Sequence, residues 1–376
     1  MNILHLTTFL QGGAGRILAD LALAQMSNNN KVYVLSSKSS EPGYCSYEEY
    51  IKKLKDNKIP FFEEDSSFKR DLGLNLHFAS RAREIINKYD IDIIHAHASI
   101  PALTGIIARS GFKKYLPVIQ TMHGWGTNKT LAQENMDLVI MNGLDKVVTV
   151  SKSDKQLLIE KGVQKEKIRV IYNGIVSEQI NDEVDPTLEY ELLKHKKEGY
   201  KIIGCIGTLC ERKNQELLLN AVKELRQDYN LFCAFIGEGD LLPKMQSQIN
   251  QENLQQNVKL YGYKPVASNY IKYFDLFVLP STSEGFGLTI VEAFKEKTPV
   301  IASDIEVFKE LITDEQEGFL FKNNSLDSLT NVIKKVLSLP QREIEEVINN
   351  GYMRYKKEFA LNKMIEEYEK LYLLFN

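Results

Sequence analysis

Residues 276–303 read LFVLPSTSEGFGLTIVEAFKEKTPVIAS. The apolar run at 276–280 predicts a buried strand, and a glycine-containing loop at 281–287 leads into an amphipathic stretch at 288–297. A second apolar run at 299–303 predicts the next strand. A strand, a helix and a further strand within about 30 residues form the βαβ unit, which joins parallel strands.

The same alternation recurs along almost the whole sequence of 376 residues. Further strands are predicted at 2–8, 31–36, 59–63, 91–97, 117–123, 146–150 and 168–172, and then at 201–207, 231–237, 258–261 and 318–321. Predicted helices include 15–26, 47–55, 76–89, 214–229, 241–253 and 326–339. The pattern predicts an α/β protein with two doubly wound parallel sheets. In the helix at 76–89, the periodicity predicts one apolar face made of Leu76, Ala79, Ala82, Ile85 and Ile86.

The sequence changes character at 177–200, which is charged, contains Pro186 and has little apolar periodicity. We interpret the first part of this stretch as a linker. The predicted division is residues 1–180, residues 181–358, and a terminal helix at 359–376 with no strand after it. At roughly 150 residues per domain, the chain length agrees with two domains.

Composition limits the class of protein. With 43% hydrophobic and 26% charged residues, the chain is neither disordered nor fibrous. It has no apolar stretch near the ~18 residues of a membrane span, no secretory signal pattern and no CxxC pair. We therefore expect a cytoplasmic protein. Residues 1–180 carry a net charge of +4 and residues 181–376 one of −7. Such an asymmetry can indicate a half that faces an anionic partner, although an ordinary solvated surface explains it too. The basic residues are dispersed, so nucleic acid is not an expected partner.

Small, polar and glycine residues follow the predicted strands, at the carboxyl ends where open α/β sheets bind ligands. They are Gly12, Gly13, His97, His123 and Asn173 in the first half, and Gly207, Thr208, Gly237, Gly262 and the 281–287 loop in the second. This convergence predicts a ligand site in a cleft between two similar domains.

Two of these segments suit a phosphate group. The loop Gln11-Gly12-Gly13-Ala14-Gly15 offers glycine amides at a predicted helix start, although tight strand–helix packing explains the same glycines. It matches neither GxGxxG nor the lysine-containing P-loop. Arg212 and Lys213 stand just ahead of another predicted helix, where paired cations can hold a diphosphate; a solvated turn is the other reading.

Glu284 and Glu292 form the most specific pattern. If the helix begins near Gly287, the two carboxylates lie about 10 Å apart at 1.5 Å rise per residue. Carboxylate pairs that cleave glycosidic bonds stand roughly 5–9.5 Å apart. The spacing favours two carboxylates that contact different parts of one long ligand.

Two further patterns involve possible ligand or metal residues. His123 ends a strand beside Gly124-Trp125-Gly126, which favours a ligand contact. Asp90-Ile91-Asp92 has the Asp-x-Asp form of metal-dependent sugar transferases, but it precedes its strand and so belongs to the opposite, amino edge. We expect no metal site.

Together, the Glu284…Glu292 spacing, Gly12-Gly13, His123, the Gly207–Lys213 turn and Asn173-Gly174 resemble the retaining glycosyltransferases of the GT-B fold, of the glycosyl transferases group 1 type. The resemblance covers essentially the whole chain. It implies two Rossmann-like domains facing a cleft, with a nucleotide-sugar donor held mainly by the second and an acceptor held mainly by the first. It also implies that the C-terminal helix crosses back to the first domain.

The resemblance implies roles position by position. Glu292 binds the donor ribose, Glu284 the donor sugar hydroxyls and Lys213 the diphosphate, while His123 lies near the reacting carbon. The implied catalytic residues are His123, Glu284 and Lys213, and the implied donor-binding residues are Gly12, Gly13, Thr208, Arg212, Lys213, Glu284, Phe286, Gly287, Leu288 and Glu292, with His97 and Asn173 on the acceptor side.

One departure concerns the diphosphate. The family commonly has arginine where this chain has Thr208, and Arg212 is a candidate to supply the missing charge. Cations and helix-end amides can stabilise a diphosphate leaving group without a divalent ion. The resemblance implies retaining transfer from a nucleotide-diphosphate sugar, and the frequency of donors in the family favours UDP sugars such as UDP-N-acetylglucosamine. With the charge supplied by these residues, we expect the transfer to be metal-independent.

The expected acceptor is a hydroxyl of a polysaccharide, glycolipid or small molecule, with no further cofactor. The basic and aromatic stretch at 109–115 favours peripheral contact with the inner membrane face, although an ordinary connection between a helix and a strand explains it too. Three alternatives stay open: a nucleotide-sugar epimerase or phosphorylase on the same fold, and a non-catalytic nucleotide-sugar-binding module. A dinucleotide oxidoreductase fits less well, because the glycine spacing is wrong.

Overall fold

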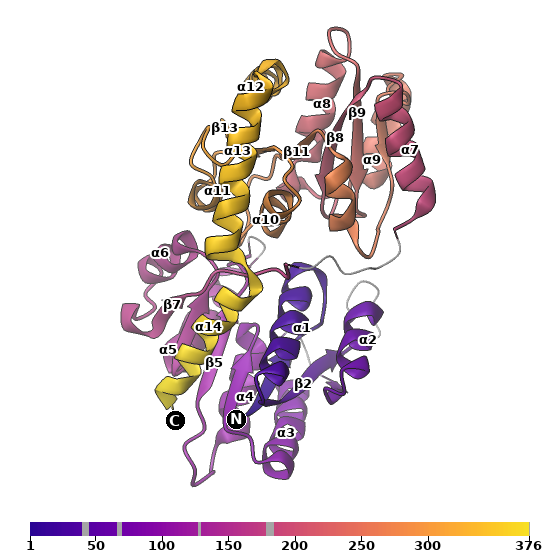
Figure 1. Ribbon diagram of the computed structural model, residues 1–376. Coiled ribbons are helices and arrows are strands. Elements are labelled where there is room, and N and C mark those ends of the chain that lie inside the picture. Colours follow the sequence, from indigo (N-terminus) through magenta and orange to yellow (C-terminus); the bar gives the residue numbers. More distant parts are fainter. Residues whose placement is uncertain (40–44, 66–69, 127–128, 178–183, 376) are drawn as a thin grey trace. The chain divides into compact units, whose positions relative to one another are not determined.

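The computed structural model describes residues 1–39, 45–65, 70–126, 129–177 and 184–375 (Figure 1). The chain forms two compact units, Met1–Ile175 with Leu361–Asn376 and Val176–Ala360, called here the first and second units. The divisions thus follow Ile175 and Ala360, where the sequence analysis expected 180 and 358. Most of the predicted linker, residues 178–183, lies outside the described residues.

Within its described residues, the first unit has a seven-stranded parallel sheet in the order β3-β2-β1-β4-β5-β6-β7. Its strands are β1 (Asn2–Thr7), β2 (Lys31–Lys38), β3 (Phe61–Asp65), β4 (Ile93–Ala96), β5 (Val118–Met122), β6 (Lys146–Thr149) and β7 (Ile168–Val170). Its helices are α1 (Gly12–Ser27), α2 (Glu48–Asp56), α3 (Leu72–Tyr89), α4 (Ser99–Arg109), α5 (Leu131–Gly143), α6 (Lys152–Glu160) and α14 (Leu361–Tyr372). The strand order reverses between β1 and β4, which makes this the switch point of the sheet.

The described part of the second unit repeats the plan with six strands in the order β10-β9-β8-β11-β12-β13. The strands are β8 (Lys201–Ile206), β9 (Leu231–Ile236), β10 (Val258–Leu260), β11 (Leu276–Leu279), β12 (Val300–Ser303) and β13 (Phe319–Phe321). The helices are α7 (Pro186–Lys197), α8 (Gln215–Leu225), α9 (Leu242–Gln251), α10 (Leu288–Lys295), α11 (Glu306–Leu311), α12 (Leu326–Ser338) and α13 (Gln341–Arg354). The switch point here lies between β8 and β11. The predicted α/β class with two doubly wound parallel sheets is confirmed.

The strands are buried because helices cover both faces of each parallel sheet. In β9, for example, every residue is buried, so the strand is continuously apolar instead of alternating. Each unit has its own apolar core, one around β1, β4 and β5 and the other around β8, β9 and β11. The two sheets are therefore separately stabilised frames, and each one fixes the positions of the loops at its own strand ends.

One local prediction was wrong, and one helix was not predicted. In α3, Leu76 is 47% exposed and Phe78 is buried in its place. The helix begins at Leu72, earlier than predicted, and its core face runs through Asn75, Phe78 and Ala82. The charged stretch after the linker also forms a helix, α7, which the weak periodicity concealed. Asp185 caps this helix by accepting from the Thr187 amide at 2.9 Å, and Pro186 occupies its first turn, where a missing N–H costs nothing.

Helix α14 belongs to the first unit, although it follows the whole of the second in sequence. Figure 1 shows it in yellow, and it packs against α1. The Leu361 amide donates to the Ile175 carbonyl at 2.9 Å, and Tyr368 and Tyr372 are buried at 1% exposure each. The predicted return of the C-terminal helix to the first domain is confirmed. Among the described residues, no helix has both the length and the apolar character that crossing a bilayer requires.

Candidate functional site

The switch point of the second unit brings together two segments that are distant in sequence. The turn after β8 carries Arg212 and Lys213, and the loop after β11 carries Glu284. The loop is tied to the turn through its backbone, because the Thr282 amide donates to the Arg212 carbonyl at 2.8 Å. Since β8 and β11 are neighbours in the sheet, their carboxyl ends hold these residues at one edge, where open α/β sheets bind ligands.

Glu284 is the centre of this cluster. Lys213 Nζ lies 2.5 Å from Glu284 Oε1, and Arg212 Nη1 lies 2.9 Å from Oε2. The Ser281 hydroxyl donates to Oε1 at 2.8 Å, and Arg212 Nη1 also donates to the Ser283 carbonyl at 2.8 Å. The Glu284 side chain is only 9% exposed. With two cations and one carboxylate, the cluster has a net charge of +1 and suits an anionic ligand.

The carboxylate of Glu284 stays ionised in spite of its burial. Burial alone would raise its pKa, but the charges of Lys213 and Arg212, together with hydrogen bonds from Lys213 and Ser281, outweigh that effect and lower the pKa. Glu284 is therefore an acceptor-only group at neutral pH. Such a group can bind hydroxyls, whereas a proton donor would need a raised pKa.

Helix α10 follows the Glu284 loop directly. Its N-cap is Gly287, which has φ +102 and no side-chain cap, and there are no acidic residues in the first turn. A Cβ atom on Gly287 would stand 2.8 Å from a ring carbon of Phe308, so both the backbone conformation and the packing require glycine. The amides of the first turn lack partners within the helix and attract anions.

The remaining residues predicted around α10 have different exposures. Glu292, in the second turn, is 5% exposed, and Phe286 is 4% exposed with its ring packed edge-on against Phe359 at 5.8 Å. Leu288 is half-buried. The Phe286 side chain thus belongs to the core, so that any contact of Phe286 with a ligand falls to its backbone.

Two other predicted positions in this unit follow neighbouring strands, Thr208 after β8 and Gly237 after β9. Thr208 is exposed, and its carbonyl accepts from Gln215 Nε2 at 2.8 Å. Gly237 is a packing glycine, because a Cβ there would stand 2.1 Å from the Gly207 carbonyl oxygen. The glycine after β9 is thus explained by the close approach of two backbones. The positive charges that an anionic ligand would need come from Arg212 and Lys213 in the turn after β8.

In the first unit, the glycine loop opens α1. Gly12 and Gly13 are exposed at the start of this helix, whose N-cap Gln11 makes no side-chain cap. Gly15 has a different role, because a Cβ there would stand 2.4 Å from the Leu10 carbonyl carbon. The predicted phosphate loop therefore divides into two exposed amide-bearing glycines and one packing glycine.

The carboxyl ends of β1, β4 and β5 hold a group of four histidines, of which only His97 and His123 were predicted as site residues. His97 Nε2 lies 2.9 Å from His5 Nδ1, and His97 Nδ1 lies 3.1 Å from His123 Nε2. His95 stacks on His97 with ring centroids 4.3 Å apart. His5 and His95 are directly paired in the sheet, but this pairing cannot be recognised before the strand order is known.

Burial lowers the pKa values of all four imidazoles. The pKa values of His5 and His123 fall to about 4, and those of His95 and His97 lie well below the usual 6.5 because of burial and, secondarily, the neighbouring histidines. All four side chains are neutral at pH 7. Nitrogens of His5, His95 and His97 lie within 4.8 Å of one another, a spacing that the ligands of a metal ion can also have.

This cluster predicts an acid-sensitive fold. The unfolded chain protonates these histidines as pH falls through 6.5, whereas the folded chain does not until the pH approaches about 4. The free energy of unfolding should therefore decrease between these values, by up to about 1.4 kcal/mol per pH unit for each histidine. Urea unfolding at pH 7.5, 6.5 and 5.5 measures the slope. His95→Gln should reduce it, and a flat profile for the wild type would contradict the assignment.

His77→Gln is the matched control. His77 lies on α3 in the same unit, and its side chain is 64% exposed. Removing an exposed imidazole should leave the pH slope of the unfolding free energy unchanged. An equal decrease of the slope in His77→Gln and His95→Gln would mean that the slope does not come from the buried cluster.

Asn173, predicted on the acceptor side, follows β7. It is 4% exposed, and its Oδ1 atom has no hydrogen-bond partner among the described residues. His97 and His123 are hydrogen-bonded to each other, whereas no hydrogen bond between described residues joins either of them to Asn173. An unpaired buried amide oxygen costs free energy, so that Asn173 is a candidate for a ligand contact.

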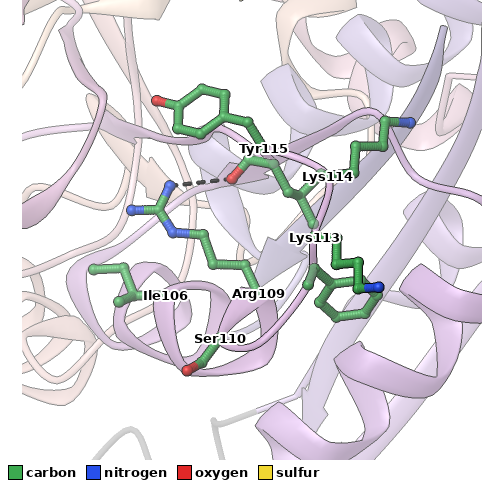
Figure 2. Close-up of a pocket in the computed structure, with 8 residues that line it drawn as sticks. Ile106, Arg109, Ser110, Lys113, Lys114 and Tyr115 are labelled. Atoms are coloured by element: carbon green, nitrogen blue, oxygen red, sulfur yellow. Dashed lines mark hydrogen bonds between the residues drawn. The ribbon is translucent and has the colours of Figure 1, made fainter.

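The amino edge of the first sheet carries a separate pocket of ≈ 520 Å³, lined by Ile106, Arg109, Ser110, Phe112, Lys113, Lys114, Tyr115 and Leu116. Arg109 Nη1 donates to the Leu116 carbonyl at 3.1 Å, a contact that the dashed line from Arg109 marks in Figure 2. Arg109 also pairs with Asp145 at 2.5 Å, and Lys114 with Asp92 at 2.6 Å. Two of the basic groups are thus already neutralised.

The Asp90-x-Asp92 segment lies at this amino edge, as predicted. Asp90 is the left-handed C-cap of α3, and Asp92 Oδ2 accepts from the Asn2 amide at 2.8 Å. The segment therefore connects a helix to a strand and lies away from the strand carboxyl ends.

Comparison with known proteins identifies the same architecture. The sequence model described as Glycosyltransferase Family 4 matches residues 11–179, and that described as Glycosyl transferases group 1 matches residues 193–354. An uncharacterized glycosyltransferase of Methanocaldococcus jannaschii is 26% identical over 337 residues, 88% of each chain. The UDP-Gal:alpha-D-GlcNAc-diphosphoundecaprenol alpha-1,3-galactosyltransferase of Escherichia coli is 27% identical over 308 residues, 77% of each chain.

Solved structures agree in fold. A glycosyltransferase from Rickettsia africae superposes with a TM-score of 0.84 at 23% identity, covering 100% of this chain and 98% of the other. An Anabaena protein solved with UDP and glucose superposes with a TM-score of 0.84 at 19% identity, covering 99% of both chains. Two doubly wound units of this kind define the GT-B class of proteins. The chain belongs to the GT-B glycosyltransferases, which confirms the predicted family; the retaining mechanism stays a prediction.

Proposed function

We propose that this glycosyltransferase transfers a sugar from a UDP-linked donor to a hydroxyl of a cell-envelope glycan or glycolipid, with retention of the anomeric configuration. The observation that carries the proposal is the Lys213–Glu284–Arg212 cluster at the switch point of the second unit. The Escherichia coli relative is named for a UDP-galactose donor and a diphosphoundecaprenol-linked acceptor, which supports this choice of donor and acceptor class.

Lys213 and Arg212 would neutralise the diphosphate leaving group. Both cations now contact Glu284, so that a bound diphosphate would share them with the carboxylate or replace it. Arg212 would supply the charge that Thr208 lacks. The amides of Phe286, Gly287 and Leu288 at the start of α10, and those of Gly12 and Gly13 at the start of α1, would add partial positive charge toward phosphate or sugar.

The two carboxylates would bind hydroxyl groups of the donor. Glu284, held ionised, would accept from the transferred sugar, and Glu292 from the ribose. His123 would bind a sugar hydroxyl near the reacting carbon, with His97 and Asn173 on the acceptor side. None of these groups is proposed as a nucleophile. We therefore propose a front-face route. The bond between the anomeric carbon and the leaving phosphate oxygen breaks as the acceptor oxygen bonds to that carbon, and a phosphate oxygen of the leaving group takes the proton of the acceptor hydroxyl.

We propose that the reaction needs no divalent ion. The positive charge that metal-dependent transferases draw from a cation would come from Lys213, Arg212 and the helix-end amides. The Asp-x-Asp pattern that could hold a metal ion lies at the opposite sheet edge, where Lys114 and the Asn2 amide already occupy Asp92. EDTA should accordingly leave the rate of transfer unchanged.

Contact with an anionic membrane surface is a further part of the proposal, placed at the amino-edge pocket. Lys113 and Tyr115, which is 63% exposed, line it. Lys113→Glu together with Lys114→Glu should abolish binding to vesicles containing anionic lipid, measured by co-sedimentation. Lys223→Glu, on an exposed surface of the second unit, is the control. Unchanged vesicle binding of the double variant would remove this part of the proposal.

The activity is tested by incubating the protein with UDP-galactose, UDP-glucose or UDP-N-acetylglucosamine and an undecaprenyl-diphosphate-linked sugar. We expect UDP release coupled to product with one of these donors, in the presence of EDTA, and an α-linkage by NMR. A β-linked product would contradict retention. Binding of a UDP sugar without release of UDP would instead identify a non-catalytic binding protein.

A further inference from the structure

A continuous chain of hydrogen bonds runs through the first unit from α1 to the end of β5. Gln25 Oε1 lies 2.8 Å from His5 Nε2, His5 Nδ1 lies 2.9 Å from His97 Nε2, and His97 Nδ1 lies 3.1 Å from His123 Nε2. Gln25, His5 and His97 are buried. We call these four residues the histidine relay.

The direction of every bond in the relay follows from its first member. An amide oxygen can only accept, so His5 must donate from Nε2, and as a neutral imidazole it then has a bare Nδ1. His97 must donate to that atom from Nε2, which leaves its own Nδ1 bare. His123 must in turn donate from Nε2. The relay therefore ends at His123 Nδ1 as an unprotonated nitrogen with a lone pair.

The orientation of the Gln25 amide is supported from its other side. Gln25 Nε2 donates to the Tyr372 hydroxyl at 2.9 Å, and that hydroxyl lies 2.7 Å from His95 Nδ1. His95 Nε2 lies 2.7 Å from the Thr121 hydroxyl. If Tyr372 donates to His95, then His95 donates to Thr121, and each of these contacts has one donor and one acceptor.

A flipped Gln25 amide would reverse the whole relay. His123 Nδ1 would then carry a hydrogen. This atom is buried and has no hydrogen-bond partner among the described residues, and buried N–H groups without an acceptor are rare. The lone-pair form is thus favoured, and it leaves one unfilled acceptor at the end of the relay.

We propose that Gln25, His5 and His97 are positioning residues that hold His123 in its Nε2–H tautomer, so that Nδ1 accepts a hydrogen bond from a hydroxyl of the bound sugar. The identity of the ligand rests on the function proposed above; the tautomer does not. A site built to accept from a hydroxyl rejects an analogue that lacks it. The relay would therefore determine which sugars are used.

The same side chains fit a metal ion less well. Both nitrogens of His95 already contact hydroxyls, and the rings of His95 and His97 are stacked instead of pointing to one centre. The nitrogen of His5 nearest to His97 is also engaged in a hydrogen bond. The low pKa values of these groups keep them neutral, as a relay of single donors and acceptors requires.

The tautomer is tested on the whole protein labelled with ¹⁵N-histidine. Long-range ¹H–¹⁵N spectra at pH 7.5 distinguish protonated from bare ring nitrogens, and loss of signals in His123→Gln assigns the residue. We expect a bare Nδ1 and a protonated Nε2 in wild-type His123. A protonated Nδ1 would overturn the proposal. A joint shift of the His5, His95 and His97 signals on addition of zinc would also overturn it, in favour of a metal site.

Variants of α1 and α14 test the positioning. Gln25→Met removes the fixed acceptor, so that His123 should become a mixture of tautomers; Tyr372→Phe, which frees the Gln25 amide, should act in the same direction. Tyr368→Phe is the matched control, because among the described residues the hydroxyl of this α14 residue is hydrogen-bonded only to Thr121, at 2.8 Å, and the His123 signals should not change. Unchanged signals in folded Gln25→Met and Tyr372→Phe would refute the positioning role.

Kinetics separate this proposal from the proposed function. In Gln25→Met, the preference for the natural UDP sugar over its deoxy analogue should decrease about 3–10-fold, the value of one hydrogen bond. The expected tautomer together with no binding of any UDP sugar would refute the proposed function and leave the relay intact. Turnover of a UDP sugar by a protein in which His123 Nδ1 is protonated would refute the relay and leave the proposed function intact.

Discussion

Replacing Lys213 with methionine should lower kcat for sugar transfer by about 10²–10³-fold, the usual effect of removing one preorganised charge from a transition state. Negative charge grows on the diphosphate as its bond to the sugar breaks, so a cation at this place stabilises the transition state more than the bound substrate. Methionine keeps most of the aliphatic stem of Lys213, whose Cε lies 3.5 Å from the position that a Cβ atom on Gly207 would occupy. Initial rates at saturating donor measure the effect.

The substitution also leaves the buried Glu284 carboxylate with one cation fewer, which should lower the melting temperature. Rates must therefore be taken per folded molecule. Lys244→Met is the matched control, because Lys244 pairs with Glu216 at 2.8 Å in the same unit but is 65% exposed. It should keep kcat within about twofold, since exposed ion pairs contribute little. A kcat for Lys213→Met near that of the wild type would contradict the role assigned to Lys213.

Glu292→Gln should weaken UDP binding by roughly 10–150-fold, since a hydrogen bond to a charged group contributes about 1.5–3 kcal/mol. Glutamine preserves the shape of this nearly buried side chain on α10 but offers one acceptor where the carboxylate offers two. The proposed partners are the ribose hydroxyls, so UDP and the UDP sugar should lose affinity equally. Isothermal titration with both ligands measures the effect.

Glu296→Gln provides the comparison, because Glu296 follows Glu292 by one turn, directly after the end of α10. UDP affinity should not change in this variant. If the affinity for the UDP sugar fell in Glu292→Gln while that for UDP did not, Glu292 would contact the sugar and not the ribose.

The strands of the two parallel sheets were predictable from the sequence, because the patterns that indicate them are local. Each apolar run in the sequence became a strand of a parallel sheet, and the loop at 281–287 stands at a strand end, as expected. The ends of elements were less certain: α3 starts earlier than its apolar pattern, and α7 forms where charged residues hide the periodicity. There, capping by Asp185 and packing of Leu188 and Leu192 decide the outcome.

The histidine cluster could not have been predicted in the same way. It depends on β1 and β4 being neighbours, which places His5 opposite His95, and on α14 bringing Tyr372 next to Gln25, 347 residues away in sequence. Similarly, the sequence placed Lys213 and Glu284 at strand ends but could not reveal that they form an ion pair. Contacts of this kind are set by strand order, which no local pattern specifies.

The proposed function requires the switch point of the second unit to bind a nucleoside diphosphate through its own cations and carboxylates. Titration of UDP into the wild-type protein with EDTA present, followed by calorimetry, tests it most directly. We expect saturable binding at one site per chain, unaffected by EDTA and lost in a Lys213→Met, Glu292→Gln double variant. No heat of binding from UDP, or binding that the double variant retains in full, would contradict it.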